Sequence, residues 1–115
     1  MTAPRRHLPS RRACETFDFS CLGMSVTASI SRYPEGTLAE IFLSNLKVGT
    51  QADIAARDSA VVASLALQHG VYVDTLRRAL LRDSQGVASG PLGVALDKYE
   101  DKQKETAHAL DVTVR

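Results

Sequence analysis

The hydrophobic pattern of this chain changes its period once, near residue 50, and this change limits the fold more than any other feature. Before it, apolar and polar residues alternate, most regularly where Met24, Val26, Ala28 and Ile30 are interleaved with serine and threonine. A period of two is typical of a strand with one buried face. After residue 50, apolar residues recur three and four positions apart, which indicates helices. The sequence therefore predicts strands followed by helices, an α+β chain.

Three strands are expected, joined by tight connections. The first spans residues 14–21 and the second residues 24–31, with Leu22-Gly23 as the turn between them. Tyr33-Pro34-Glu35-Gly36 predicts a second turn, because proline presets φ for the second position and glycine suits the fourth. The third strand then spans residues 37–44. Short connections between successive strands favour an antiparallel meander.

The first helix is predicted to begin after Thr50 and to end at Gly70. Thr50-Gln51-Ala52-Asp53 resembles a capping box with aspartate in place of the preferred glutamate. Glycine adopts the left-handed conformation that commonly ends a helix. The apolar stripe expected to face the sheet consists of Ile54, Val61, Val62 and Leu65, broadened by many alanines that allow close packing.

Two further helices follow in the prediction. One spans residues 73–82, and another begins at Pro91, since proline is favoured at the first helical position. Their apolar stripes are Val73, Leu76 and Leu80, then Leu92, Ala95, Leu96 and Tyr99. Residues 100–115 are strongly polar, and we expect a frayed tail there. The expected domain, residues 13–99, is a three-stranded antiparallel sheet covered on one face by two or three helices.

The ends of the chain differ from its middle in charge. The 115 residues fit one domain, and a formal net charge of +1 does not indicate a nucleic-acid or membrane surface. Residues 1–12 nevertheless hold Arg5, Arg6, Arg11 and Arg12 and no acid. We expect a flexible basic arm. The alternative is an arm that contacts anions, such as the phosphates of a nucleic acid.

Compartment and chemistry are constrained mainly by what the sequence lacks. No apolar run approaches the ~20 residues that span a bilayer, and a cytoplasmic location is expected. If Cys14 and Cys21 share one strand, they lie roughly 23 Å apart at ~3.3 Å per residue, too far for a disulfide. The three histidines are widely spaced and the glycines are scattered. We therefore predict no metal, no cofactor and no catalytic residue.

A candidate partner surface lies on the third strand. In a regular strand, Leu38 and Phe42 project from the face that is otherwise polar. An apolar pair there needs cover. Either the third helix buries it with Leu92, Leu96 and Tyr99, or the pair anchors a homodimer or another protein partner.

Several segments together resemble the TSCPD domain, the C-terminal accessory region of adenosylcobalamin-dependent ribonucleotide reductases. The resembling stretch runs from about Phe17 to Leu96. It includes Ala39-Glu40-Ile41-Phe42-Leu43 before Lys47-Val48-Gly49, where the family has a strand ending near a Lys-x-Gly turn. It also includes Ser64-Leu65-Ala66-Leu67 before His69-Gly70-Val71, similar to the family's helix end and Gly-Val step.

The resemblance implies an accessory or regulatory module that acts through a protein partner in deoxyribonucleotide metabolism, with a reductase subunit or a second copy as that partner. One departure is clear. Ser89-Gly90-Pro91-Leu92 stands where the family has Ser-Cys-Pro-Asp, so the cysteine and the carboxylate are missing. The catalytic barrel and the cysteines of the reductase are missing too. We therefore do not expect reductase activity; the alternative function is a small nucleic-acid-associated regulatory protein using the arginine-rich arm.

Overall fold

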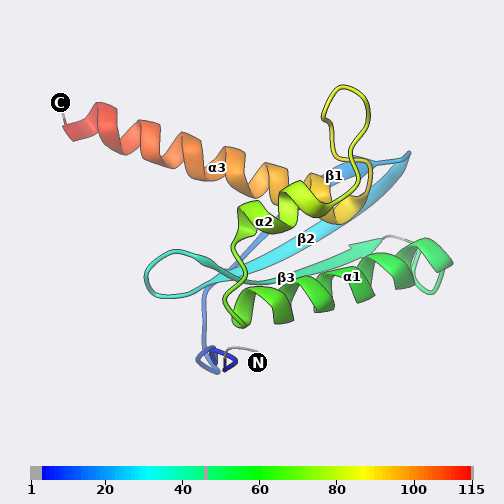
Figure 1. Ribbon diagram of the computed structural model, residues 1–115, viewed down its shortest axis with the longest axis horizontal. Helices are drawn as coiled ribbons and strands as arrows, with labels where there is room; N and C mark the ends of the chain where they lie inside the picture. Colours follow the sequence, from blue (N-terminus) through cyan, green and yellow to red (C-terminus); the bar gives the residue numbers. More distant parts are fainter. Residues whose placement is uncertain (1–3, 46, 115) are drawn as a thin grey trace.

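The elements follow the order that the sequence predicts. In the computed structural model, residues 4–45 and 47–114 are described, residues 106–114 by secondary structure alone. The first three positions of the predicted arm and the last of the predicted tail lie outside the described residues. The elements are β1 (Cys14–Cys21), β2 (Met24–Arg32), β3 (Leu38–Asn45), α1 (Gln51–Gln68), α2 (Val73–Ala79) and α3 (Pro91–Val114). The sheet is antiparallel in the order β1-β2-β3, which confirms the α+β prediction (Figure 1).

Both predicted turns join strands as expected. Cys21 pairs with Met24 across Leu22-Gly23, and these two residues have φ of 53° and 76°. Two positive φ values define the type I′ turn, whose twist matches that of the strands. At the second turn the Gly36 N–H donates to the Tyr33 carbonyl oxygen at 2.8 Å.

A β-bulge in β3 changes which face its first residue occupies. Ser31 pairs with Glu40, but Arg32 pairs with Leu38, so Ala39 is an extra residue on β3. One extra residue moves the residue before it to the opposite face. Leu38 therefore joins the core and is 3% exposed, whereas Phe42 stays on the outer face. The expectation that these two side chains share a face is wrong.

The core lies between one face of the sheet and helices α1 and α3, and α2 is only partly buried against it. The strands contribute mainly Phe19, Val26, Ala28, Ile30, Ile41 and Leu43. Leu92, Ala95, Leu96 and Tyr99 of α3 are all buried, which confirms that predicted stripe. The α2 stripe, Val73, Leu76 and Leu80, is partly buried against the same cluster.

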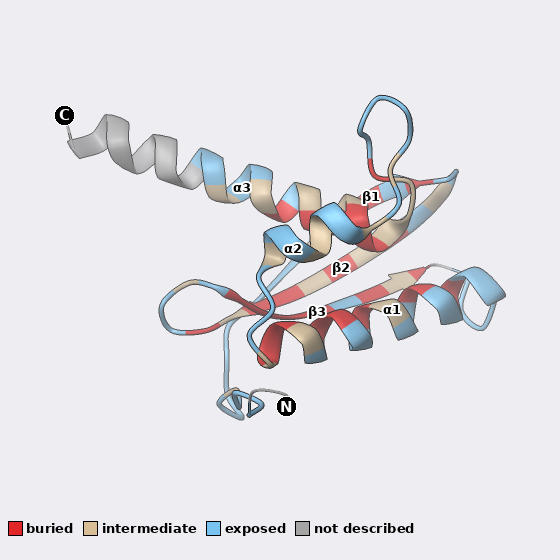
Figure 2. Ribbon diagram, viewed as in Figure 1, coloured by how far each residue is buried: buried red, intermediate tan, exposed pale blue. Residues whose placement is uncertain are grey.

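Helix α1 begins and ends as predicted but is rotated from the predicted orientation. Thr50 accepts a hydrogen bond from the Asp53 N–H at 3.2 Å. At the other end Gly70 has φ of 94°. The predicted apolar stripe, however, is solvent-accessible: Ile54, Val61, Val62 and Leu65 are 40 to 66% exposed. The buried positions of α1 face β3 (Figure 2).

Two helix ends differ from the prediction. Helix α2 ends at Ala79, three residues early, because Leu80 is extended and Arg82 pairs with Ala88 in an isolated bridge. Both Arg77 and Arg82 bond the carboxylate of Asp97 on α3, at 2.8 to 2.9 Å. Helix α3 continues to Val114, so residues 100–114 are helical where a frayed tail was expected.

Candidate functional site

Helix α1 supplies side-chain hydrogen bonds to the edge of β3, the side on which the described part of the chain places no strand. The Ser64 hydroxyl accepts from the Ile41 N–H and donates to the Ile41 carbonyl oxygen, both at 2.9 Å. The Gln68 amide donates to the Ala39 carbonyl oxygen at 3.1 Å. Asp53 accepts from the Asn45 N–H at 3.1 Å. The helix therefore substitutes for a fourth strand at these positions.

The lengths of the two elements make this pairing work along β3. From residue 39 to 45 a strand advances about 20 Å at ~3.3 Å per residue. From residue 53 to 68 a helix advances about 22 Å at 1.5 Å per residue. Because α1 runs antiparallel to β3, one polar side chain from each end of the helix reaches each end of the strand.

The same geometry places an apolar row on the outer side of α1. At about 100° per residue, Ile54, Val61 and Leu65 lie about 60 to 100° round the helix axis from Ser64 in one direction. The core-facing Ala60 and Leu67 lie in the other direction. The row therefore borders the outer face of the sheet. Phe42 is on that face, paired with Ser29 and 48% exposed. We call Phe42, Ile54, Val61 and Leu65 the outer strip.

The predicted arm packs against the domain instead of extending freely. Arg6 forms an ion pair with Glu35 and lies 3.8 Å over the ring of Tyr33. The backbone N–H of Arg6 also donates to the Gln68 carbonyl oxygen at 2.7 Å. Arg12 bonds the buried carboxylate of Glu40 at 2.7 Å. These contacts tie residues 4–12 to the domain, and the flexibility of the arm stays a prediction.

These contacts also reduce the positive charge that the arm presents to solvent. Arg6 holds the pKa of Glu35 down at about 2, chiefly through their hydrogen bonds. Arg5 donates to the Gln68 side chain at 2.6 Å. Arg11 is exposed. With Arg6 and Arg12 both paired to carboxylates, the arm offers little support for the alternative of phosphate binding.

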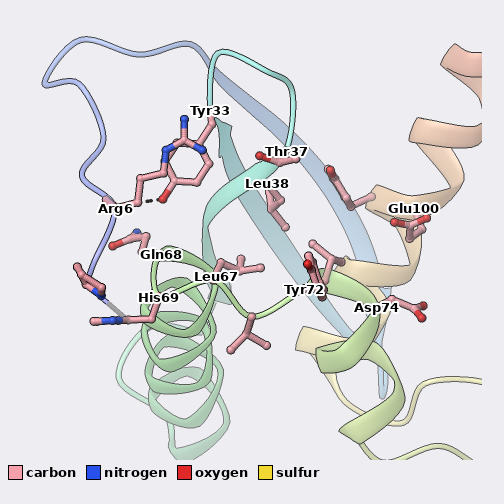
Figure 3. A pocket seen from close by; sticks show the side chains of 15 residues that line it. Arg6, Tyr33, Thr37, Leu38, Leu67, Gln68, His69, Tyr72, Asp74 and Glu100 are labelled. Atoms are coloured by element: carbon pink, nitrogen blue, oxygen red, sulfur yellow. Dashed lines mark hydrogen bonds between the residues drawn. The ribbon is translucent and has the colours of Figure 1, made fainter. Parts of the chain in front are cut away.

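The cavity between the arm and the start of α2 has a volume of about 520 Å³ (Figure 3). It is bordered by Arg6, Tyr33, Gln68, Tyr72 and Glu100, among others. The charged side chains that line it are already paired: Arg6 with Glu35, and Asp74 and Glu100 with Arg77. This cavity is best explained as the space between the arm and the domain where the two pack together.

A second cavity, of about 580 Å³, lies where the β1–β2 turn meets α1 and the start of α3. We call it the turn pocket. Ser89-Gly90-Pro91-Leu92, the stretch that resembles the family's motif, forms part of its wall. The Cys21 thiol lies beneath this stretch, 3.8 Å from the Ser89 carbonyl oxygen, and burial raises the pKa of this thiol. Cys14 is exposed, and neither cysteine is bridged.

Comparison with known families, curated proteins and solved structures finds no match to this chain. The resemblance to the TSCPD domain therefore remains a prediction. Within residues 4–45 and 47–105, no three histidine, cysteine or acidic side chains gather as a metal site. Over the same residues, no helix combines the length and the apolar character that crossing a bilayer requires.

Proposed function

We propose that this chain is a protein-interaction module that binds its partner through the outer strip. The observation that carries the proposal is that Phe42, Ile54, Val61 and Leu65 are 40 to 52% exposed, and helical spacing places the three α1 residues beside the sheet face that holds Phe42. Apolar side chains that gather on one surface, with polar neighbours, are typical of protein-binding sites. Here the polar neighbours are the serine and threonine residues of the outer sheet face.

The strip has the features of a rigid binding surface. Phe42 is carried by a strand whose backbone is bonded on both sides, to β2 and to Ser64 of α1. Its ring supplies an aromatic anchor of the kind that contributes most to binding at protein interfaces. The three aliphatic side chains are held on a helix of 18 residues. Little conformational entropy would be lost on binding a partner.

The resemblance to the TSCPD domain indicates which partner to test first. An accessory module of that kind acts beside a ribonucleotide reductase, so the catalytic subunit of that enzyme is the proposed partner. The proposal places no chemistry in this chain: the module would position or regulate the subunit, in support of deoxyribonucleotide synthesis.

Binding of the purified chain to the reductase catalytic subunit from the same cells tests the proposal, with affinity measured by calorimetry or interferometry. Val61→Asp should weaken binding at least about 10-fold, because one buried valine contributes ~1.5 kcal/mol or more and each 1.4 kcal/mol is tenfold. Val62→Asp is the matched control. Val62 is the next residue, also exposed, and lies about 100° further round α1, outside the strip.

The paired design separates a binding effect from a folding effect. Both substitutions place aspartate on an exposed part of the same helix, so their melting temperatures should change alike. Equal loss of binding in the two variants would contradict a role for the strip. Failure of the unmodified chain to bind the subunit would contradict the proposed partner.

A further inference from the structure

Leu22 occupies a position of the β1–β2 hairpin that is unfavourable for a leucine. Its φ of 53° lies in the left-handed region, which asparagine, aspartate and glycine adopt more easily. The type I′ turn ordinarily carries Asn-Gly for this reason. The leucine side chain is also 76% exposed. In the single chain, therefore, neither the backbone nor the burial of its side chain accounts for a leucine here.

The turn pocket lies directly beside this side chain. Leu22 and Leu81 form part of its rim, and Leu81 is 78% exposed. The floor and walls include Met24, Ala55, Leu80 and Leu92. Of the described residues that line the pocket, none is charged. An occupant must therefore be apolar and uncharged where it enters, since a charge placed there would lose its hydration without gaining a partner.

One surface thus carries both an apolar projection and an apolar hollow. In a two-fold symmetric interface, the same patch of both subunits meets itself, so it must be complementary to itself. A leucine held out on a two-residue turn, next to a pocket without charges, meets that condition. A foreign partner would need only the hollow. It would not account for the projecting leucine in its strained backbone conformation.

We infer that the turn pocket is the docking site for a second copy of this chain, with Leu22 of each copy seated in the pocket of the other. The pair is a symmetric homodimer, and Leu81 adds apolar contact at the rim. This interface is separate from the outer strip. On α1, the outer strip lies on one side of the residues that bond the edge of β3 (Asp53, Ser64 and Gln68). The pocket lies on the other side, where Ala55 lines it. A dimer would therefore present two outer strips to partners.

Sedimentation velocity over a dilution series tests the inference with the full chain. The unmodified chain should dimerise with a micromolar dissociation constant. Leu22→Asn should weaken the dimer by at least ~100-fold, because each dimer holds two such side chains and burying one leucine contributes ~10-fold or more. Asparagine suits the left-handed turn, so the variant should melt no lower than the unmodified chain at concentrations where both are monomeric.

A second variant blocks the hollow instead of the projection. Ala55→Glu places a charge at the pocket, and glutamate is a good helix former, so the fold should persist. Val62→Glu is its matched control, since Val62 lies two turns further along the same stripe of α1, outside the pocket. The dimer should weaken in Ala55→Glu and stay unchanged in Val62→Glu.

Several outcomes would overturn the inference. One is a monomeric unmodified chain at high micromolar concentration; another is a dimer that survives both Leu22→Asn and Ala55→Glu. A monomer whose pocket takes up the apolar dye ANS, with uptake lost in Ala55→Glu, would assign the pocket to an apolar ligand other than a second copy. The proposed function fails separately: Val61→Asp should leave the dimer intact, and Leu22→Asn should leave binding of the reductase subunit intact.

Discussion

Helices α1 and α3 both bury apolar side chains against the same sheet, but α1 also bonds the backbone of a strand edge with polar side chains. Helix α3 lies over the apolar face and buries Leu96 and Tyr99 there. Helix α1 lies beside the edge of β3 and turns Ser64 and Gln68 toward it, while Val61 faces solvent. A sheet face requires apolar area from its cover, but a strand edge requires donors and acceptors.

The contrast shows that amphipathicity predicts a helix more securely than it predicts the side that faces the protein. The buried residues of α1 are mostly small or polar, with a single large apolar side chain: Asp53, Ala56, Ala60, Ala63, Ser64, Leu67 and Gln68. Alanine lets the helix axis approach the strand closely enough for a serine hydroxyl to bond the backbone. A leucine at position 60 or 63 would hold the two elements apart.

The largest effect is expected from removing apolar volume under α3. Leu96→Ala should lower the free energy of unfolding by about 2 to 5 kcal/mol, because Leu96 is fully buried and its removal leaves a cavity. Chemical denaturation measures the change. Leu65→Ala on the exposed side of α1 is the comparison, and its cost should stay below ~1 kcal/mol. Similar losses at the two positions would mean that α1 also buries its apolar side.

A smaller loss is expected from removing one edge bond of α1. Ser64→Ala leaves the N–H and carbonyl of Ile41 without their partner in a buried place, which should cost about 1 to 3 kcal/mol. Ser59→Ala is the control. The Ser59 hydroxyl bonds the Ala56 carbonyl oxygen of its own helix, and the gain in helix propensity is the same. A loss at Ser64 no larger than at Ser59 would show that the edge bonds contribute nothing.

The smallest and most specific expected effect is a loss of stability at acid pH. Backbone hydrogen bonds from Gly49 and Asn45, then Arg57, lower the pKa of the buried Asp53 carboxyl. Its stabilisation is therefore present above the unfolded pKa of about 3.9 and is lost as pH falls through the lower folded value. The melting temperature of the unmodified chain should fall in that window.

Asp53→Asn should flatten this acid decline, because asparagine does not titrate. Glu35, with a pKa of about 2, titrates in the same range in both proteins and cancels in the comparison. Asp58→Asn, at an exposed position of α1, controls for the loss of one negative charge. An acid profile of Asp53→Asn that matches the unmodified chain would remove Asp53 as the cause.

Local chemistry in the sequence predicted most of the fold. Leu22-Gly23, Thr50 and Pro91 each act within a few residues, so the two-residue turn, the helix cap and the start of α3 could be predicted. The bulge at Ala39 could not, because it depends on how β2 and β3 align over their whole length. The rotation of α1 could not either, since alternation and helical period do not say whether a helix covers a face or an edge.

The missed bulge and the missed rotation of α1 change which residues make up the outer strip. Phe42 was predicted on the outer sheet face and lies there, but Leu38, its predicted companion, moved to the core with the bulge. Its actual companions, Val61 and Leu65, had been assigned to the core. A clue was present in the alanines at 56, 60 and 63, whose spacing marks a second candidate for the packed side of α1.

The segment His69-Gly70-Val71 has a physical explanation of its own besides the resemblance. The Gly70 N–H donates to the Leu67 carbonyl oxygen and the Val71 N–H to the Ala66 carbonyl oxygen. This is the Schellman arrangement that ends many helices. A match to the TSCPD family at these three residues is therefore weaker evidence for the resemblance than a match along β3.

The position of α1 beside β3 also gives the sheet a direction of growth. An added strand, from a partner or from a misfolded neighbour, needs unpaired backbone groups on an outermost strand. At β3 the helix already bonds several of them. In the part of the chain that the structure describes, β1 has no strand on its other side. A further strand can therefore be added at β1 but not at β3. The exposed Glu15 and Asp18 place negative charge along β1, and this charge would select among the strands that could pair there.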